Sequence, residues 1–539
     1  MSYQKNLKLK IICTRHLFTF FIAIAALTVA SPYASAQANN KSEQDVLKIV
    51  QDFLNTQKQS MSSQGYELKS EGDFNVSSQG DYFSVTSPAL SVIYADQSKL
   101  DIGIVAMNVA KADRPDFWKT TIAFPRPMMI IDAEGNRVST IDIGQQRFAG
   151  LWHAPSQQYL KFDGVLKDIE VSDQENSGKF SIQTFSLKSD LEEQSSGLWS
   201  GPAEYKIENM KFTDQTGSQD MFSIGSIAIT GHVDGYNLES GKQFQDKINA
   251  RLASFANKVN SDTASPQEMA DFYSFLIESA GSVMKGMRFD MAINGIEGTT
   301  KGNQKAGIPP ASFSLASITY GMDMNGFDTD KSNIGMNFGY SGLSSEAIPA
   351  DLKRYVPSQM NFDVNFTNLP LKEIIKRAGQ TAASTNAGNQ QAIAAKMQQM
   401  TPEILSASNT KIQIQDTYVG NGVYNASLEG VVKADSKAVH KATADALVTI
   451  KGLDTMLNDL QQQAQNASSP EERAKISQAL QGLSMIKMFS QVSPDDPQSR
   501  TVDLDLTQQG DFLINGTSLQ NMMGGGRPPG GAQQGAAAP

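Results

Sequence analysis

Phe83-Ser-Val-Thr-Ser-Pro-Ala-Leu90 is the stretch of sequence that decides the fold, because variants of it recur three times farther along the chain. The other copies are Phe180-Ser-Ile-Gln-Thr-Phe-Ser-Leu187, Phe222-Ser-Ile-Gly-Ser-Ile-Ala-Ile229 and Phe313-Ser-Leu-Ala-Ser-Ile-Thr-Tyr320. Two copies also follow similar segments, 166–173 and 207–214. A repeated strand pair indicates architecture rather than chemistry. We therefore expect sheets that are built from related strand units.

The length and composition indicate a folded protein of several units. The chain has 539 residues, of which 40% are hydrophobic and 19% charged, and such a composition is too apolar for a disordered protein. At about 100–200 residues per domain, two to four units are expected. We place a helix and a β-rich repeat unit at 37–235, helices and a second β-rich unit at 236–369, helical segments and closing strands at 370–520, and a disordered Gly/Pro/Ala tail at 521–539.

The first 36 residues have the pattern of a secretory signal peptide. A basic segment precedes the apolar run Leu17–Val29, and Ala34-Ser35-Ala36 is a small-x-small cleavage site. The apolar run is shorter than the ~20 residues that span a bilayer, and no later segment is long and apolar enough. We expect cleavage after Ala36 and a periplasmic protein without a transmembrane segment, with an extracellular location as the alternative.

The charge and the cysteine content exclude several classes of function. Removing residues 1–36 takes four basic and no acidic residues from totals of 46 and 56, which leaves a net charge of −14. An acidic protein is a poor nucleic-acid binder, because such binding depends on neutralising phosphates. The single cysteine, Cys13, lies in the signal segment. The mature chain therefore has no disulfide, no thiol nucleophile and no thiolate metal site.

The hydrophobic spacing predicts an α+β fold dominated by antiparallel sheets. Strand-like alternation prevails from 66 to 235 and returns after 286, whereas helical spacing is found at 43–54, 241–283, 370–408 and 436–490. Ser265-Pro-Gln-Glu268 has the form of a capping box, and Thr401-Pro402 indicates a new helix start. We expect the helices to pack on one face of the sheets and 436–490 to form a helical hairpin.

One face of the central strands is rich in methionine and phenylalanine, and it is the candidate binding site. Methionine is flexible and adapts to irregular partners, so a concave face of this kind can hold acyl chains. The alternative is that the helices cover this face as an ordinary core. The candidate residues are Met287, Phe289, Met291, Met336, Phe338, Phe362 and Val364.

No residue group predicts catalysis. The chain has no Gly-x-Ser-x-Gly elbow, no phosphate-binding Gly-Lys-Ser/Thr loop and no His-Glu-x-x-His helix. His153 is expected at a sheet edge or in a loop. Asp323–Asp330 is more typical of a turn than of a calcium loop, and Asp503 and Asp505 are typical of the polar face of a strand. We expect a protein without catalytic, metal or cofactor sites, and a hydrolase with an unrecognised site is an alternative.

The C-terminal third resembles the end of YdgA-like proteins, which are exported bacterial proteins of unknown function. The resemblance rests on a long helical stretch, a strand, a Gln-Gly-Asp turn and Phe512-Leu-Ile-Asn-Gly516. It implies export and transfers no catalytic residue. Export, the lack of a catalytic motif and the amphipathic sheets lead us to expect a non-enzymatic envelope protein that binds a hydrophobic ligand such as a lipid, or an envelope protein partner. A purely structural scaffold is the other alternative.

Overall fold

A computed structural model describes residues 43–522 except 64, 157, 174–177, 196, 214–219, 245–246, 249–250, 252–264, 301–309, 349–352, 385–389 and 468. The predicted signal peptide and residues 523–539 of the expected tail lie outside the described residues. The structure is 54% strand and 25% helix, which confirms the prediction of a β-dominated chain. The chain divides into two compact units, of which the first contains residues 1–330 and the second most of the remainder. The sequence boundaries expected at 235 and 369 stay predictions.

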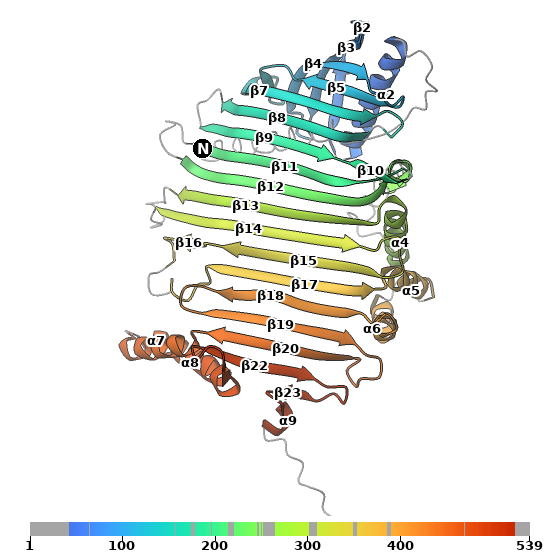
Figure 1. Cartoon of the computed structure of the whole chain (residues 1–539). Helices are drawn as coiled ribbons and strands as arrows, with labels where there is room; N and C mark the ends of the chain where they lie inside the picture. Colours follow the sequence, from blue (N-terminus) through green and yellow to red (C-terminus); the bar gives the residue numbers. More distant parts are fainter. Residues whose placement is uncertain are drawn as a thin grey trace, which may run out of the picture. The chain divides into compact units, whose positions relative to one another are not determined.

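The first unit begins with a helix and continues as a long antiparallel sheet (Figure 1). Its helices are α2 (Glu43–Ser63) and α4 (Pro266–Val283). Its strands are β1 (Glu67–Glu71), β2 (Asn75–Ser78), β3 (Tyr82–Ile93), β4 (Lys99–Lys111), β5 (Phe117–Ala123), β6 (Met128–Ile131), β7 (Arg137–His153), β8 (Gln158–Asp173), β9 (Lys179–Asp190), β10 (Glu192–Ser195), β11 (Leu198–Thr213), β12 (Asp220–Asn237), β13 (Gly286–Thr300), β14 (Ala311–Asn325) and β16 (Ser344–Ser345).

Strand order in this unit closely follows chain order. The main series is β3–β4–β5–β7–β8–β9–β11–β12–β13–β14. Short strands complete it: β1 and β2 pair with β3, β6 lies between β4 and β7, β10 pairs with β11, and β16 pairs with β14. All these pairs are antiparallel, as the short Gly-, Asn- and Asp-rich connections predict.

The recurring Phe-Ser phrase occupies equivalent positions in the sheet. Phe180 of β9 and Phe222 of β12 both lie opposite Phe212 of β11. Gly298 of β13 in turn lies between Phe222 and Phe313 of β14. Three copies of the phrase therefore stand at the same level on alternate strands, and the repeat is a structural unit of one strand pair.

The repeat also carries a regular interruption of the hydrogen-bond ladder. Asp168 of β8 and Asn209 of β11 occupy the same position in the two similar segments, and both have positive φ values, 53° and 51°. In each pairing with β9 the register passes over this residue and Gln183. Gly295 of β13 lies in the corresponding position with φ 64°. Asp, Asn and Gly are the residue types that adopt this conformation most readily.

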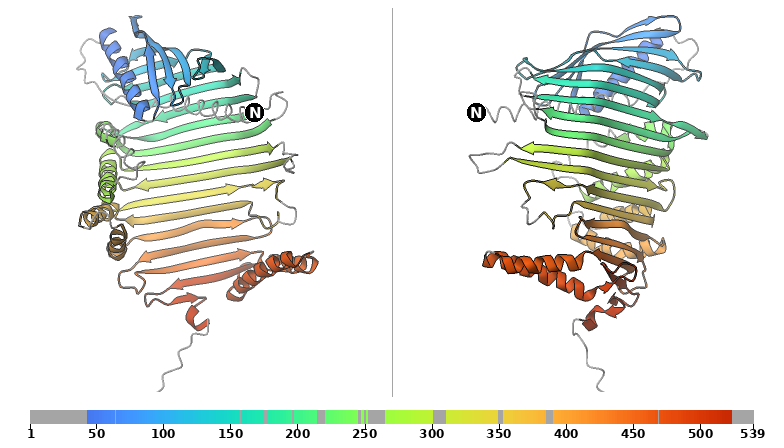
Figure 2. Two further views of the ribbon diagram at one scale, coloured as in Figure 1. Left: turned by 180° about the vertical axis from the view of Figure 1, so that it is seen from behind. Right: turned by 60° about the vertical axis from the view of Figure 1, so that its left-hand side comes forward.

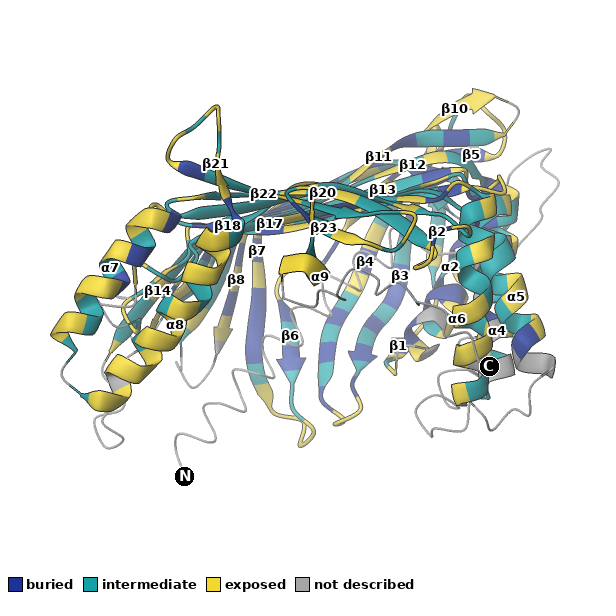
Figure 3. Cartoon of the chain, turned by 90° about the horizontal axis from the view of Figure 1, so that it is seen from below, coloured by how far each residue is buried: buried dark blue, intermediate teal, exposed yellow. Residues whose placement is uncertain are grey.

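Helix α2 lies against one face of the N-terminal strands, as Figure 2 shows from two sides. The buried residues of α2 pack on this face. The predicted stripe of this helix is confirmed: Val46, Val50 and Leu54 are all buried. Val46 and Val50 pack in one cluster with Trp118 of β5 and Trp152 of β7. A larger cluster extends along β3, β4 and β6–β9. Figure 3 shows buried positions alternating with intermediate ones along β3, β4 and β6.

Helix α4 begins as its sequence predicts. The Ser265 hydroxyl accepts a hydrogen bond from the Glu268 backbone N–H at 3.2 Å, and the Ser265 N–H donates to the Glu268 carboxylate at 2.9 Å. Proline occupies the first helical position. This reciprocal arrangement is the capping box expected from Ser265-Pro-Gln-Glu268.

The second unit contains further antiparallel strands and most of the remaining helices. Its strands are β15 (Ser332–Ser341), β17 (Gln359–Leu369), β18 (Lys411–Gly420), β19 (Asn425–Ala434), β20 (Ala442–Lys451), β21 (Gln491–Val492), β22 (Ser499–Leu506), β23 (Phe512–Ile514) and β24 (Thr517–Ser518). They pair in the order β15–β17–β18–β19–β20–β22–β23–β24, with β21 beside β22. The helices are α5 (Leu371–Ser384), α6 (Gln390–Ala407), α7 (Leu453–Asn466), α8 (Pro470–Phe489) and α9 (Leu519–Met522).

The prediction of helix from 436 onward was wrong for its first part. Residues 442–451 form β20, which pairs with both β19 and β22. Leu447 and Ile450 fit a helical spacing, but this segment also contains several β-branched residues, which favour a strand. Gly452 follows with φ 80° and ends the strand, and α7 begins at the next residue. Helices α7 and α8 contact each other.

The predicted helix start at Thr401-Pro402 was also wrong. Helix α6 runs through Pro402 without interruption. Proline removes one helical hydrogen bond. In the same turn the Thr401 hydroxyl donates to the Met397 carbonyl at 2.7 Å. The arrangement expected for the helices as a group, on one face of the sheets, stays a prediction.

Candidate ligand-binding site

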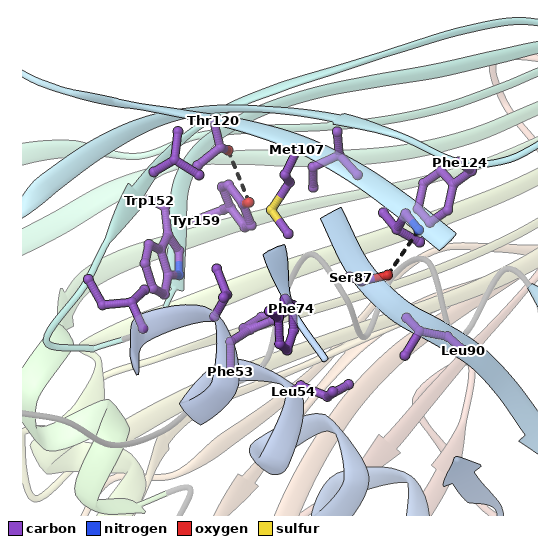
Figure 4. A pocket seen from close by; sticks show the side chains of 15 residues that line it. Phe53, Leu54, Phe74, Ser87, Leu90, Met107, Thr120, Phe124, Trp152 and Tyr159 are labelled. Carbon is purple, nitrogen blue, oxygen red and sulfur yellow. Dashed lines mark hydrogen bonds between the residues drawn. The ribbon is translucent and has the colours of Figure 1, made fainter. Parts of the chain in front are cut away.

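A cavity lies between α2 and the sheet of the first unit (Figure 4). Its volume is about 60 Å³, measured as the space open to the centre of a water-sized sphere. By this measure one water needs about 10–15 Å³, so the cavity has room for a small organic molecule or the end of a longer one. The lining residues are Ile49, Val50, Phe53, Leu54, Phe74, Ser87, Leu90, Val105, Met107, Val109, Thr120, Ile122, Phe124, Trp152 and Tyr159.

The alternation of side chains along β4 determines which of its residues line the cavity. Val105, Met107 and Val109 alternate along β4 and face the cavity. Ile104 points to the other face, where it is 55% exposed. Helix α2 contributes the opposite wall through Val50 and its neighbours. The cavity is thus a gap between two complementary apolar surfaces.

The cavity has no charged lining. None of its fifteen lining residues is acidic or basic. The polar side-chain atoms of the lining are the hydroxyls of Ser87, Thr120 and Tyr159 and the indole nitrogen of Trp152. Transfer of an ionised group into such surroundings costs several kcal/mol unless a partner is present. The lining therefore favours an uncharged ligand.

Few polar atoms line the cavity, and they differ in how many hydrogen bonds they make within the protein. The Ser87 hydroxyl is fully used, because it donates to the Pro88 carbonyl at 2.7 Å and accepts from the Val105 N–H at 2.9 Å. The Thr120 hydroxyl donates to the Tyr159 hydroxyl oxygen at 3.0 Å (Figure 4). Burial raises the pKa of Tyr159 to about 12, so the phenol is neutral at neutral pH.

Trp152 lies beside Tyr159 at one end of the cavity (Figure 4). Its side chain is 6% exposed. Its indole Nε1 is buried, and no atom of the described residues accepts its hydrogen. An unsatisfied buried donor costs about 1–3 kcal/mol, so a ligand atom that accepts a hydrogen bond from this N–H would remove this cost.

A second hollow lies on the opposite face of the same strands. Its volume is about 950 Å³, and it is far more open and more polar than the cavity. Lys119, Lys161 and Lys188 contribute to its lining. Lys161 pairs with Asp190 at 2.6 Å. Because charged side chains line it, this hollow is a solvated concave surface rather than an apolar site.

His153 lies at the end of β7 beside a third hollow of about 520 Å³. Its Nδ1 is 2.8 Å from the hydroxyl of Ser156, and its ring is 4.7 Å from that of Phe117. Burial lowers the pKa of His153 to about 4, although Asp116 acts in the opposite direction. Ser156 is only 2% exposed, so its hydroxyl is poorly placed to attack a substrate. The arrangement is that of a structural hydrogen bond.

The acidic candidates lie on strands or in a turn. Asp323 is at the end of β14, and Asp328 and Asp330 lie in the turn that follows it, as the sequence predicts. Asp503 and Asp505 are in β22. Asp505 lies opposite Asp445 of β20, and burial together with Asp503 and Asp445 raises the pKa of the Asp505 carboxyl. Among the residues that the structure describes, no group of three or more metal-binding side chains comes together.

The candidate residues in β13 are half-buried. Met287, Phe289 and Met291 lie opposite Met324, Met322 and Tyr320 of β14 in the first unit. The rings of Phe289 and Tyr320 are 6.1 Å apart in an edge-on arrangement. Cross-strand contacts of this kind stabilise a sheet without requiring a ligand.

The remaining candidates belong to the second unit. In β15, Met336 and Phe338 are 37% and 40% exposed. In β17, Phe362 is 46% exposed, whereas Val364 is 6% exposed. The seven predicted residues are thus divided between the two units, and none of them lines the cavity beneath α2.

Sequence reasoning missed the cavity. The amphipathic stripe of α2 and the alternation of β4 were both recognised, but spacing alone does not reveal where two apolar surfaces fail to fill the space between them. The available signal was the cluster of large aromatic residues, Trp118, Trp152 and Tyr159, in strands close to an N-terminal amphipathic helix.

None of the described helices is long and apolar enough to cross a membrane. Comparison with known proteins finds no protein-family model and no curated protein that matches the chain.

Proposed function

We propose that this protein is a non-enzymatic, exported binding protein of the cell envelope, whose first unit holds a small hydrophobic ligand or the end of a lipid chain. The single observation that supports the proposal is the uncharged cavity beneath α2. Protein interiors are normally close-packed, and gaps larger than a water molecule are few. The sequence supports export through the signal pattern of residues 1–36.

The experiment compares two identical substitutions on neighbouring strands. Ile122→Phe in β5 adds a ring to the cavity lining, whereas Ile104→Phe in β4 adds the same ring to the exposed face. Binding of methylenecyclopentane to the full mature chain is measured by saturation-transfer NMR. We expect binding to the parent and to Ile104→Phe, and its loss in Ile122→Phe. If the parent binds neither this hydrocarbon nor the ketone of equal shape, cyclopentanone, the proposal is contradicted.

Two other functions are separated by native mass spectrometry of protein that is purified without detergent. A co-purified small molecule supports ligand binding, whereas a co-purified protein chain supports the scaffold. Turnover of an ester substrate that persists in Ile122→Phe and disappears in Ser156→Ala supports a hydrolase. The kinship with YdgA-like proteins is likewise a proposal, and it rests on the C-terminal sequence pattern alone.

A further inference from the structure

The bonding of the polar atoms in the cavity indicates which hydrophobic molecules it prefers. Thr120 and Tyr159 have two hydroxyl hydrogens between them, and the bond that joins their oxygens uses only one. No atom of the described residues accepts the second hydrogen from either side chain. One O–H donor is therefore left over at the cavity wall, whichever hydroxyl donates to the other.

Trp152 adds a second donor at the same end. Its Nε1–H has no acceptor in the part of the chain that the structure describes, and its ring lies beside Tyr159 (Figure 4). Ser87, the other hydroxyl in the lining, already donates and accepts. The cavity thus has unused hydrogen-bond donors, and its lining contains no cation that would neutralise a carboxylate.

We propose that the cavity binds an uncharged ligand with a carbonyl oxygen, such as a ketone or an ester, which accepts hydrogen bonds from the Thr120–Tyr159 hydroxyl pair and from Trp152. This proposal rests on the proposed function, because it names the class of ligand for the same site. A carbonyl oxygen has two lone pairs and no donor of its own, so it satisfies both leftover hydrogens without creating a new unmet donor. A carboxylate would have to lose its hydration without a partner charge.

The test uses two ligands of equal shape, cyclopentanone and methylenecyclopentane, which differ in a carbonyl oxygen against a methylene carbon. Thr120→Val and Tyr159→Phe each remove one hydroxyl and also the bond between the two. Each single variant therefore keeps one free O–H donor, and only the double variant loses it. We expect the double variant to weaken ketone binding about tenfold, and each single variant to change it by no more than about twofold.

The hydrocarbon serves as the internal reference, and Met107→Leu serves as the matched control, because it changes the lining without removing a donor. This control variant should leave the ratio of the ketone and hydrocarbon dissociation constants unchanged within about twofold. In the parent protein, the infrared band of the bound ketone carbonyl should lie at lower frequency than the band of the same ketone without a hydrogen bond. This measurement requires no variant to fold.

The outcomes separate the two proposals. If the hydrocarbon binds but the ketone band is unshifted and the double variant keeps the ratio, the ligand class is wrong and the binding function stands. If neither molecule binds to the parent, the binding function itself is wrong. Binding of butanoate as tight as that of cyclopentanone would also overturn the preference for an uncharged ligand.

Discussion

The strands around the α2 cavity and the strands of the second unit share the same apolar–polar alternation, yet they differ greatly in burial. In β7 and β8, Ile141 and Leu166 are fully buried. In β19 and β20, whose residues the structure describes in full, no side chain is fully buried. Alternation therefore determines which residues share a face, whereas burial requires a second layer, which α2 supplies to the first group.

The largest test of this difference is an acidic residue in the covered core. Leu166 is 0% exposed within the main cluster of the first unit. We expect Leu166→Asp to lower the free energy of unfolding by more than about 4 kcal/mol, because the carboxylate would be buried without a partner. Tryptophan fluorescence during urea unfolding reports on this unit alone, since Trp118, Trp152 and Trp199 are the only tryptophans in the chain. A native-like unfolding midpoint would contradict the burial of this face.

Helix α2 provides the next test, because it is the covering layer itself. Leu54 is 7% exposed and packs into the core. We expect Leu54→Ala to cost about 2–4 kcal/mol in the same fluorescence measurement. Leu447→Ala in β20 is the matched control, since Leu447 is 43% exposed and its truncation should cost less than about 1 kcal/mol by far-UV circular dichroism. Equal losses at the two sites would remove the distinction between the regions.

His153 makes the stability of the first unit depend on pH. Its pKa is about 4 in the folded state and 6.5 in its ordinary state, so the unfolded chain binds the proton more readily. The stabilisation is complete above pH 6.5 and is lost as the pH falls toward 4. Between pH 7.5 and 5 we expect His153 to account for about 2 kcal/mol of lost stability.

The measurement is urea unfolding by tryptophan fluorescence at both pH values. His153→Gln should flatten this part of the profile. Identical profiles for the parent and His153→Gln would show that the imidazole is no more buried in the folded state than in the unfolded chain.

Much of the architecture was predictable because it depends on local patterns. The α2 stripe and the α4 capping box both follow from the spacing and the type of residues in the sequence. Strand β20 did not follow, because its pairing with β19 and β22 outweighed the helical spacing. Helix α6 did not follow either, because it continues through Pro402, where the sequence indicates a new helix start.

The candidate site was less predictable, and β4 shows the reason. Strict alternation from Leu100 would place Ile104 in the core, but Ile104 is 55% exposed and Val105 is 5% exposed. Gly103, with φ 83°, coincides with irregular pairing to β3 and reverses the faces that the following residues occupy. A bulge of this kind has no reliable signal in the hydrophobic pattern, and the cavity lining depends on it.

The smallest expected effect is at the exposed methionine and phenylalanine side chains of the second unit, Met336, Phe338 and Phe362. Met336 is 37% exposed, so water already reaches its side chain. We expect Met336→Asp to change the free energy of unfolding by less than about 1 kcal/mol, because the new carboxylate keeps most of its hydration. Thermal unfolding followed by far-UV circular dichroism is the measurement, and Val364→Asp is the control, since Val364 is 6% exposed and the same change there should cost several kcal/mol. A collapse of the melting temperature in Met336→Asp would mean that this face is covered in solution. The half-exposed methionine and phenylalanine side chains would then belong to an occupied binding surface, and not to a sheet face that is open to water.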